Sequence, residues 1–210
     1  MPTEVACFFS HYQLWQIIAR SEQPALVLED DALLSDKVTA FLGLMQNLKG
    51  VDHITLENRL RKKLLGSYQA LGSKLGIARL FQDRTGAAAY ILWPSGAKLL
   101  VNHAHMNGAA LADAFIGNFY SLNSWQAVPA LAVQSDVAAQ YGIHSPLQTH
   151  SYIQANDSKA NYQKTGFSAF RFKLRRLKAQ LKLAKRFVLC AGRAKRVLVN
   201  VVAEDFNRNY

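Results

Sequence analysis

Cysteine is scarce in this chain: Cys7 and Cys190 are the two in 210 residues, one near each end. Their positions match no zinc-binding spacing and no CxxC motif and imply no disulfide framework, so a reducing compartment fits best. The chain does not open on a basic segment followed by an apolar stretch, and it has no run of about 18 apolar residues. We therefore expect neither a secretory signal nor a membrane-spanning helix.

Acidic residues are almost absent from the last quarter of the chain. Residues 159–210 contain 14 Lys and Arg against 2 Asp and Glu, whereas residues 1–158 contain 11 against 12. The excess charge of +11 therefore belongs to the C-terminal end. We expect residues 1–158 to form one near-neutral globular domain and residues 159–210 to form a basic tail that associates with membranes.

Apolar periodicity predicts alternating helices and strands in the domain. Residues 4–19 carry apolar side chains at helical spacing, and a short apolar strand over 24–28 stops at Glu29. Further helices are expected over 36–48, 95–103 and 109–119, and further strands over 52–56, 78–81, 86–92 and 127–134. Residues 57–79 are basic and interrupted by glycines, so we expect a loop or lid there, and residues 135–165 are expected to be loop. This order of elements indicates an α/β fold.

The pattern changes in the tail. From Phe167 to Cys190, apolar residues recur every three or four positions and Lys or Arg occupies the other faces, which predicts a basic amphipathic helix. Such a helix would bind an anionic membrane surface, whereas a basic tail can also bind the phosphates of a nucleic acid. The apolar stripe favours the membrane, and the sequence contains no motif that reads RNA or DNA.

Three adjacent carboxylates, Glu29, Asp30 and Asp31, follow the strand over 24–28. Open α/β sheets bind ligands beyond the carboxyl ends of their strands. Hard ions such as Mg²⁺ and Mn²⁺ prefer oxygen ligands and bridge protein carboxylates to substrate phosphates. The run therefore predicts a metal site for a phosphorylated ligand. An exposed acidic turn that caps the next helix is the alternative, and the tripeptide alone leaves both open.

Five segments carry a family resemblance. They are CFFSHYQLW at 7–15, PALVLEDDA at 24–32, TGAAAYIL at 85–92, SGAKLL at 95–100 and VPALAVQ at 128–134. In this order they resemble glycosyltransferase family 25, which acts in bacterial lipooligosaccharide synthesis and in collagen galactosylation. The resemblance covers residues 3–136, and the first two segments are its most specific part.

The resemblance implies a partial A-type glycosyltransferase (Rossmann-like) domain with a nucleotide-sugar donor, UDP-galactose, and a divalent metal, manganese. Asp30 and Asp31 are then the expected metal ligands, and Glu29 is expected to act in catalysis at the donor sugar. Asp113 is the candidate general base that deprotonates the acceptor hydroxyl, with a surface or ion-paired Asp as the alternative. The expected substrate-binding residues are Ser10, His11, Thr85, Gly86 and Gln134.

The same resemblance implies a glycolipid acceptor, a lipooligosaccharide, at the cytoplasmic face of the bacterial inner membrane. The chain departs from the family pattern at one point: members carry further strands before the helix of Ser10 and His11, and these strands hold the base and ribose of the nucleotide. A sheet that lacks them would expose an apolar edge and favour self-association. A non-catalytic remnant of the family and a basic nucleic-acid-binding protein are the two alternative functions.

Overall fold

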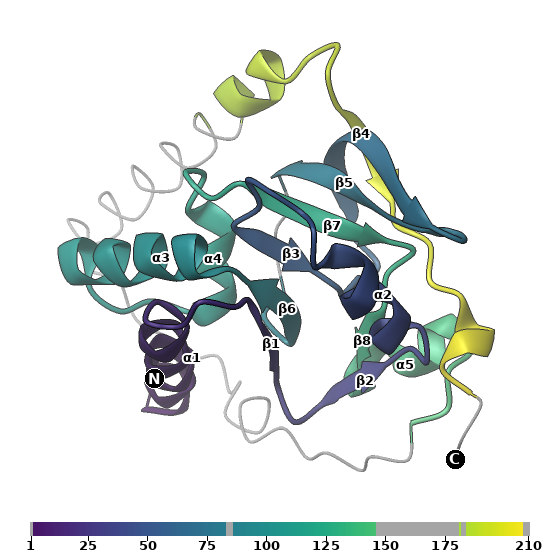
Figure 1. The fold of residues 1–210 in the computed structure, drawn as a ribbon, viewed down its shortest axis with the longest axis horizontal. Coiled ribbons are helices and arrows are strands. Elements are labelled where there is room, and N and C mark those ends of the chain that lie inside the picture. The colour runs from purple at the N-terminus through teal and green to yellow at the C-terminus, as the bar shows by residue number, and fades with distance from the viewer. Residues whose placement is uncertain (1, 83–85, 146–180, 182–183, 208–210) are drawn as a thin grey trace, which may run out of the picture.

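A mixed β-sheet lies at the centre of the computed structural model, which describes residues 2–82, 86–145, 181 and 184–207 (Figure 1). The strands of this sheet, in spatial order, are β1 (Ala25–Leu28), β6 (Ala89–Leu92), β3 (His53–Thr55), β7 (Ser124–Val128), β5 (Leu75–Gln82), β4 (Lys62–Gly72) and β9 (Lys195–Leu198). Two short strands, β2 (Ala32–Leu34) and β8 (Ala132–Gln134), form a separate ribbon. The helices are α1 (Pro2–Ile18), α2 (Val38–Met45), α3 (Pro94–Asn107), α4 (Ala112–Asn118) and α5 (Ser135–Ala138), with short 3-10 turns η1 (Ala139–Tyr141) and η3 (Ala203–Asp205).

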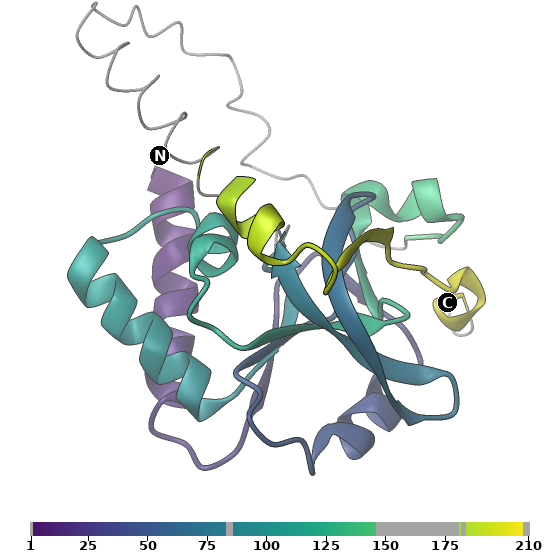
Figure 2. The same ribbon diagram turned by 90° about the horizontal axis from the view of Figure 1, so that it is seen from above.

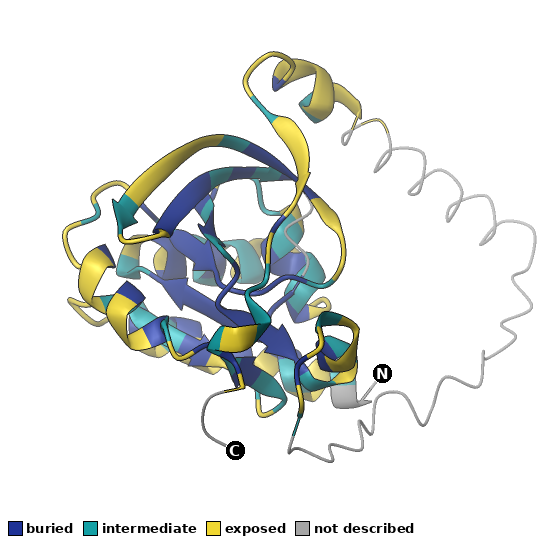
Figure 3. Ribbon diagram, turned by 90° about the vertical axis from the view of Figure 1, so that its right-hand side faces the viewer, coloured by how far each residue is buried: buried dark blue, intermediate teal, exposed yellow. Residues whose placement is uncertain are grey.

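Helices cover both faces of the sheet, as Figures 1 and 2 show. Successive side chains of a strand point to opposite faces. In β6, Tyr90 and Leu92 therefore join the core beneath α1, α3 and α4, whereas Ala89 and Ile91 join the core beneath α2. Figure 3 shows the central strands buried between these layers. This arrangement confirms the α/β, Rossmann-like class predicted from the sequence.

Residues 57–79 differ from the expected loop, because most of them form a long antiparallel hairpin of β4 and β5. The glycines there are sites of close packing rather than breaks in the chain. A Cβ at Gly66 would lie 2.7 Å from the ring of Phe81, and one at Gly76 would lie 2.5 Å from the ring of Tyr68. The interior strand positions Leu64 and Leu80 are buried, but the basic residues around them hide this apolar pattern in the sequence.

Residues 195–206 fold with the domain, although we expected them in a separate tail. The strand β9 extends the sheet by pairing with β4, and Val199 and Phe206 are buried. The side chain of Asn58 donates a hydrogen bond to the Val199 carbonyl at 2.7 Å. Beyond β9, Val199 and Val201 pack in a cluster with Leu80, whereas the Lys and Arg side chains of β9 itself are exposed and give this segment its basic appearance.

Only part of the predicted amphipathic helix can be followed. Residues 184–189 are helical, whereas most of the predicted helix lies outside the described residues. Within the part of the chain that the structure describes, each helix is too short or too polar to span a bilayer.

The strand β1 forms one edge of the sheet and pairs with β6 alone among the described strands. Large apolar side chains are exposed beside it on α1, including Phe9 and Ile17, which are 50% and 66% exposed. An exposed apolar surface next to an open strand edge is consistent with the expected self-association, which stays a prediction.

Replacing Phe206 tests whether the C-terminal residues stabilise the domain. Phe206 is 4% exposed and packs in a cluster with Leu33 and Val133. Because Phe206→Ala leaves a cavity there, we expect it to lower the free energy of unfolding by about 3–5 kcal/mol in urea titrations. Phe187→Ala is the matched control: that ring is 47% exposed, and its loss should cost under about 1 kcal/mol. Equal, small effects of the two substitutions would show that the segment is not part of the cooperative unit.

Candidate active site

The carboxyl ends of three strands meet at one edge of the main sheet. Because β1 and β3 both pair antiparallel with β6, and β7 is parallel to β3, all three run in the same direction. The three carboxylates Glu29, Asp30 and Asp31, which we call the acidic run, follow β1, and Glu57 follows β3. The chain that leaves β7 leads into the short strand β8, which ends at Gln134. This is the edge at which open α/β sheets bind their ligands.

The acidic run is not a helix cap. It leads into the strand β2, and the next helix, α2, begins only at Val38. Asp30 is exposed. Asp31 is partly buried, and its Oδ1 atom is buried without a hydrogen-bond partner among the described residues. Burial, followed by the nearby charge of Glu29, raises the pKa of Asp31. An oxygen in this position is suited to a cation that arrives with a ligand.

Gln134 orients Asp31 from the neighbouring strand. Its amide Nε2 donates to Asp31 Oδ2 at 3.1 Å, and its Oε1 accepts a hydrogen bond from Arg59 Nη1. The other guanidinium nitrogen of Arg59, Nη2, forms an ion pair with Asp136 at 2.5 Å. Gln134, which we expected to bind substrate, thus connects a metal-ligand candidate to a network of protein groups.

His11 orients Glu29 from α1. Its Nε2 lies 3.0 Å from Glu29 Oε1, and its Nδ1 lies 2.9 Å from the Tyr90 hydroxyl. The Trp15 indole N–H donates to the same hydroxyl at 2.9 Å. Burial raises the pKa of Tyr90 well above its usual value, so the phenol keeps its proton and can donate it to His11 Nδ1. The Nε2–H of His11 then donates to Glu29, so both ring nitrogens are bonded within the protein.

The other predicted site residues are spread around this edge. Ser10 is exposed, and its hydroxyl donates to the Ala6 carbonyl within α1 at 3.1 Å. Asp113, in the first turn of α4, accepts a hydrogen bond from the Ala114 N–H at 2.5 Å. Gly86 precedes β6 with φ of 117°, a conformation that favours glycine. Thr85 lies outside the described residues.

Carboxylates from two distant parts of the sequence act on the Cys7 thiol. Its pKa is raised by burial and then by the negative charges of Glu29, Asp113, Asp30 and Asp31. The candidate base on α4 and the acidic run after β1 therefore act on one point of α1. The structure brings together residues that the sequence separates by more than eighty positions.

Glu57 is a further carboxylate at this edge that we did not anticipate, because residues 57–79 were expected to be a loop. It is fully buried, and its carboxylate makes no hydrogen bond of good geometry among the described residues, although the main chain of Ala88 is near enough to act on it. Its side chain lies directly against Gly86, where a Cβ would come within 1.1 Å of Glu57 Oε1. The available signal was its position just after the predicted strand over 52–56, which matches the position of Glu29 after β1.

The environment of Glu57 favours its neutral form. Burial raises its pKa to about 7, although the charges of Lys63 and Arg59 act in the opposite direction. Lys63 is buried beside it and donates to the Glu57 main-chain carbonyl at 2.8 Å and to Gln126 Oε1 at 2.5 Å. A carboxyl group that changes charge near neutral pH is common at catalytic sites.

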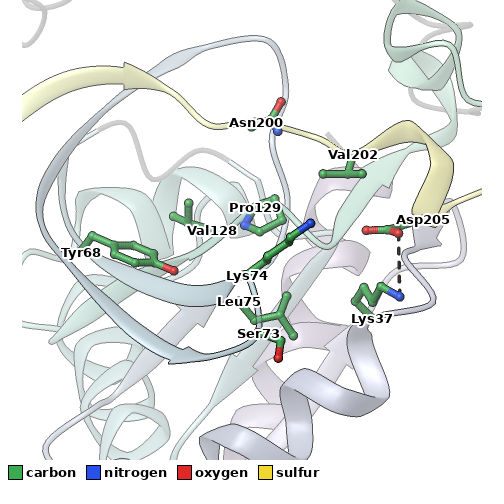
Figure 4. Close-up of a pocket in the computed structure, with 10 residues that line it drawn as sticks. All are labelled: Lys37, Tyr68, Ser73, Lys74, Leu75, Val128, Pro129, Asn200, Val202 and Asp205. Atoms are coloured by element: carbon green, nitrogen blue, oxygen red, sulfur yellow. Dashed lines mark ion pairs between the residues drawn. The ribbon is translucent and has the colours of Figure 1, made fainter.

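A pocket of about 620 Å³ lies elsewhere, between the turn of the β4–β5 hairpin and the C-terminal segment (Figure 4). Its lining includes Tyr68, Lys74 and Asn200, and Lys37 there forms an ion pair with Asp205 at 3.9 Å. None of the predicted site residues lines it. The pocket is thus separate from the carboxyl-end edge of the sheet and its carboxylates, which together we call the acidic edge.

The stability of the chain should depend on the charge of Glu57. Its pKa is raised from 4.5 to about 7 on folding, so its destabilising effect is absent below about pH 4.5, grows towards pH 7 and persists above it. The glutamine of Glu57→Gln cannot ionise, so ionisation at this position should not lower the unfolding free energy of this variant as the pH rises from 4.5 to 7. We expect the difference in unfolding free energy between about pH 5 and pH 8 to shrink by roughly 1–3 kcal/mol in urea titrations. The exposed Glu22→Gln should leave it unchanged, and an unchanged difference in Glu57→Gln would mean that Glu57 is charged throughout.

Comparison with known proteins shows the family of this chain. The sequence matches the model of glycosyltransferase family 25 (LPS biosynthesis protein) over residues 2–116. It is also similar to the lipooligosaccharide biosynthesis protein lic2B of Haemophilus influenzae, with 27% identity over 179 residues that cover 77% of this chain and 66% of that protein. The chain thus spans just under two thirds of the length of this relative. Because the family match covers more than half of the chain, including α1 and every carboxylate of the acidic edge, the chain belongs to glycosyltransferase family 25.

Proposed function

We propose that the chain is a hexosyltransferase that moves galactose from UDP-galactose onto a lipooligosaccharide. The observation that carries the proposal is the set of carboxylates at the acidic edge, within the residues matched by the family model. The similar protein of Haemophilus influenzae is named for lipooligosaccharide biosynthesis, which supports a glycolipid acceptor. The galactose and the uridine nucleotide are the specific parts of the proposal.

The side chains of the acidic run fit a hard divalent cation, which we take to be Mn²⁺. Asp31 offers an oxygen, Oδ1, that is buried and has no hydrogen-bond partner among the described residues, and the exposed Asp30 offers carboxylate oxygens beside it. Oxygen ligands of this kind suit Mg²⁺ and Mn²⁺. Bound there, the cation would neutralise negative charge on the diphosphate leaving group.

Asp113 is proposed as the general base of an inverting transfer. In this reaction the acceptor hydroxyl oxygen bonds to the anomeric carbon, the bond from that carbon to the diphosphate breaks, and the hydroxyl proton passes to the Asp113 carboxylate. The Ala114 N–H holds one carboxylate oxygen of Asp113, which leaves the other to face an acceptor. Glu29, held by His11, is proposed to contact the donor sugar.

The enzyme is proposed to work at the cytoplasmic face of the bacterial inner membrane. The end of the predicted amphipathic helix supports this location, because Phe187, Val188 and Leu189 are 47%, 70% and 68% exposed beside the exposed Lys185. Apolar and basic side chains on one short helical segment suit an anionic membrane surface.

Donor binding should depend on Asp31. Calorimetric titration of the purified chain with UDP-galactose is expected to give heat of binding only when Mn²⁺ is present, because the cation links the carboxylate to the diphosphate. Asp31→Asn should weaken this binding at least about tenfold, a cost of about 1.4 kcal/mol. The control is Asp36→Asn, which removes a carboxylate beyond β2 that pairs with Lys37 at 3.6 Å. Binding that is equally tight in Asp31→Asn would refute the assignment, and a folded chain that binds no donor would favour the non-catalytic remnant.

Removing the carboxylate of Asp113 should separate catalysis from donor binding. A general base contributes about 10²–10⁴-fold to the rate, so Asp113→Asn is expected to lower kcat by that factor. The donor affinity measured by calorimetry should stay within about twofold, because the base acts on the acceptor hydroxyl. A kcat close to that of the unchanged chain would assign the base to another carboxylate of the edge.

A further inference from the structure

Three side chains of different chemistry converge where α1 passes the end of β1. The thiol of Cys7, the imidazole of His11 and the carboxylate of Glu29 each place a ligand atom within 4.8 Å of the other two. Cys7 and His11 are four residues apart on α1, so their side chains lie on the same face of the helix. Glu29 approaches from the sheet, and its Oε1 lies 3.0 Å from His11 Nε2.

The surroundings favour a positive charge at this point. Four carboxylates, those of Glu29, Asp113, Asp30 and Asp31, act on the Cys7 thiol. Among the described residues, no Lys or Arg forms an ion pair with Glu29, Asp30 or Asp31. A divalent cation beside the thiol would reverse the electrostatic effect of these groups on the sulfur and stabilise the thiolate.

The hydrogen bond at His11 Nδ1 is of the kind that orients metal-binding histidines. Such residues use one ring nitrogen for the metal, while a hydrogen bond to the other fixes the ring. The Tyr90 hydroxyl lies 2.9 Å from His11 Nδ1 and is itself fixed by the Trp15 indole. The phenolic oxygen has two lone pairs, so it can accept both the indole N–H and a proton on Nδ1.

From these contacts we infer that Cys7, His11 and Glu29 form a binding site for a divalent transition metal of the Zn²⁺ class, separate from the hard-cation ligands Asp30 and Asp31. A thiolate and an imidazole select Zn²⁺ over Mg²⁺ or Mn²⁺. Ligand atoms around tetrahedral Zn²⁺ are roughly 3.5 Å apart. His11 Nε2 and Glu29 Oε1, at 3.0 Å, are already within that separation, and the Cys7 thiol, within 4.8 Å of both, needs to approach them by about an ångström at most. A water molecule would complete the four ligands.

Binding would move two protons. The Cys7 proton leaves to solvent as the metal–sulfur bond forms, so binding should strengthen as the pH rises. The His11 proton moves from Nε2, which binds the metal, to Nδ1, which then donates to Tyr90. Glu29 is assigned both to this Zn²⁺ site and to the contact with the donor sugar. A bound Zn²⁺ would therefore draw Glu29 away from the sugar and slow transfer, a consequence that rests on the proposed function.

Cobalt titration tests the site without any measurement of activity. Co²⁺ takes the place of Zn²⁺, and a cysteine ligand gives an intense near-ultraviolet sulfur-to-cobalt band. We expect the full chain, freed of metal with a chelator, to develop this band with one equivalent of Co²⁺ and to lose it on addition of Zn²⁺. Excess Mn²⁺ should not displace the cobalt.

Variants then assign the ligands. Cys7→Ser should abolish the band, while Cys190→Ser, which changes the other cysteine of the chain, should keep it. Glu29→Gln should keep the band but weaken Co²⁺ binding at least tenfold, which tests the site even if Cys7→Ser fails to fold. No band in the unchanged chain, or a band that persists in Cys7→Ser, would overturn the inference. Loss of UDP-galactose binding with an intact cobalt band would contradict the proposed function alone.

Discussion

The hydroxyl of Tyr90 is the hydrogen-bonding centre on which the acidic edge depends. Tyr90 is fully buried in β6, the strand that pairs with both β1 and β3. An unpaired buried hydroxyl costs about 1–3 kcal/mol, and here two residues of α1, Trp15 and His11, supply its partners. Because these contacts fix both the rotation and the position of α1 along the sheet, they also fix where His11 meets Glu29.

Side chains other than Lys and Arg orient the acidic run. His11 holds Glu29, and the amide of Gln134 holds Asp31. Arg59 contacts the same network, but its guanidinium is bound to Gln134 and paired with Asp136. Among the described residues, no Lys or Arg forms an ion pair with the carboxylates of the acidic run, so a bound cation could supply the opposite charge. Glu57 differs from them, because burial raises its pKa to about 7 and its carboxyl group therefore changes charge near neutral pH.

Much of the fold could be predicted from local pattern alone. The apolar spacing of residues 4–19 and 24–28 predicted α1 and β1, which the structure confirms. The pattern failed where charged residues share a strand with buried ones. In β4, Lys63 is a charged residue in a basic segment and so favoured the prediction of a loop. It is buried, however, because its ammonium group donates a hydrogen bond to Gln126, two strands away in the sheet. In β9 the basic residues face solvent while the chain beyond them, at Val199, packs into the domain.

The sequence motifs predicted candidate site residues, but the contacts of their atoms depend on distant partners. Ser10 and His11 are neighbours in one motif, yet the hydroxyl of Ser10 is bonded within its own helix and the ring of His11 is bonded to residues 18 and 79 positions away. Glu57 carries no motif, and its burial depends on the missing side chain of Gly86. A motif therefore specifies which groups reach the edge, whereas the tertiary hydrogen bonds decide which oxygens stay unpaired. Those unpaired oxygens are the groups that a ligand arriving at the edge would meet.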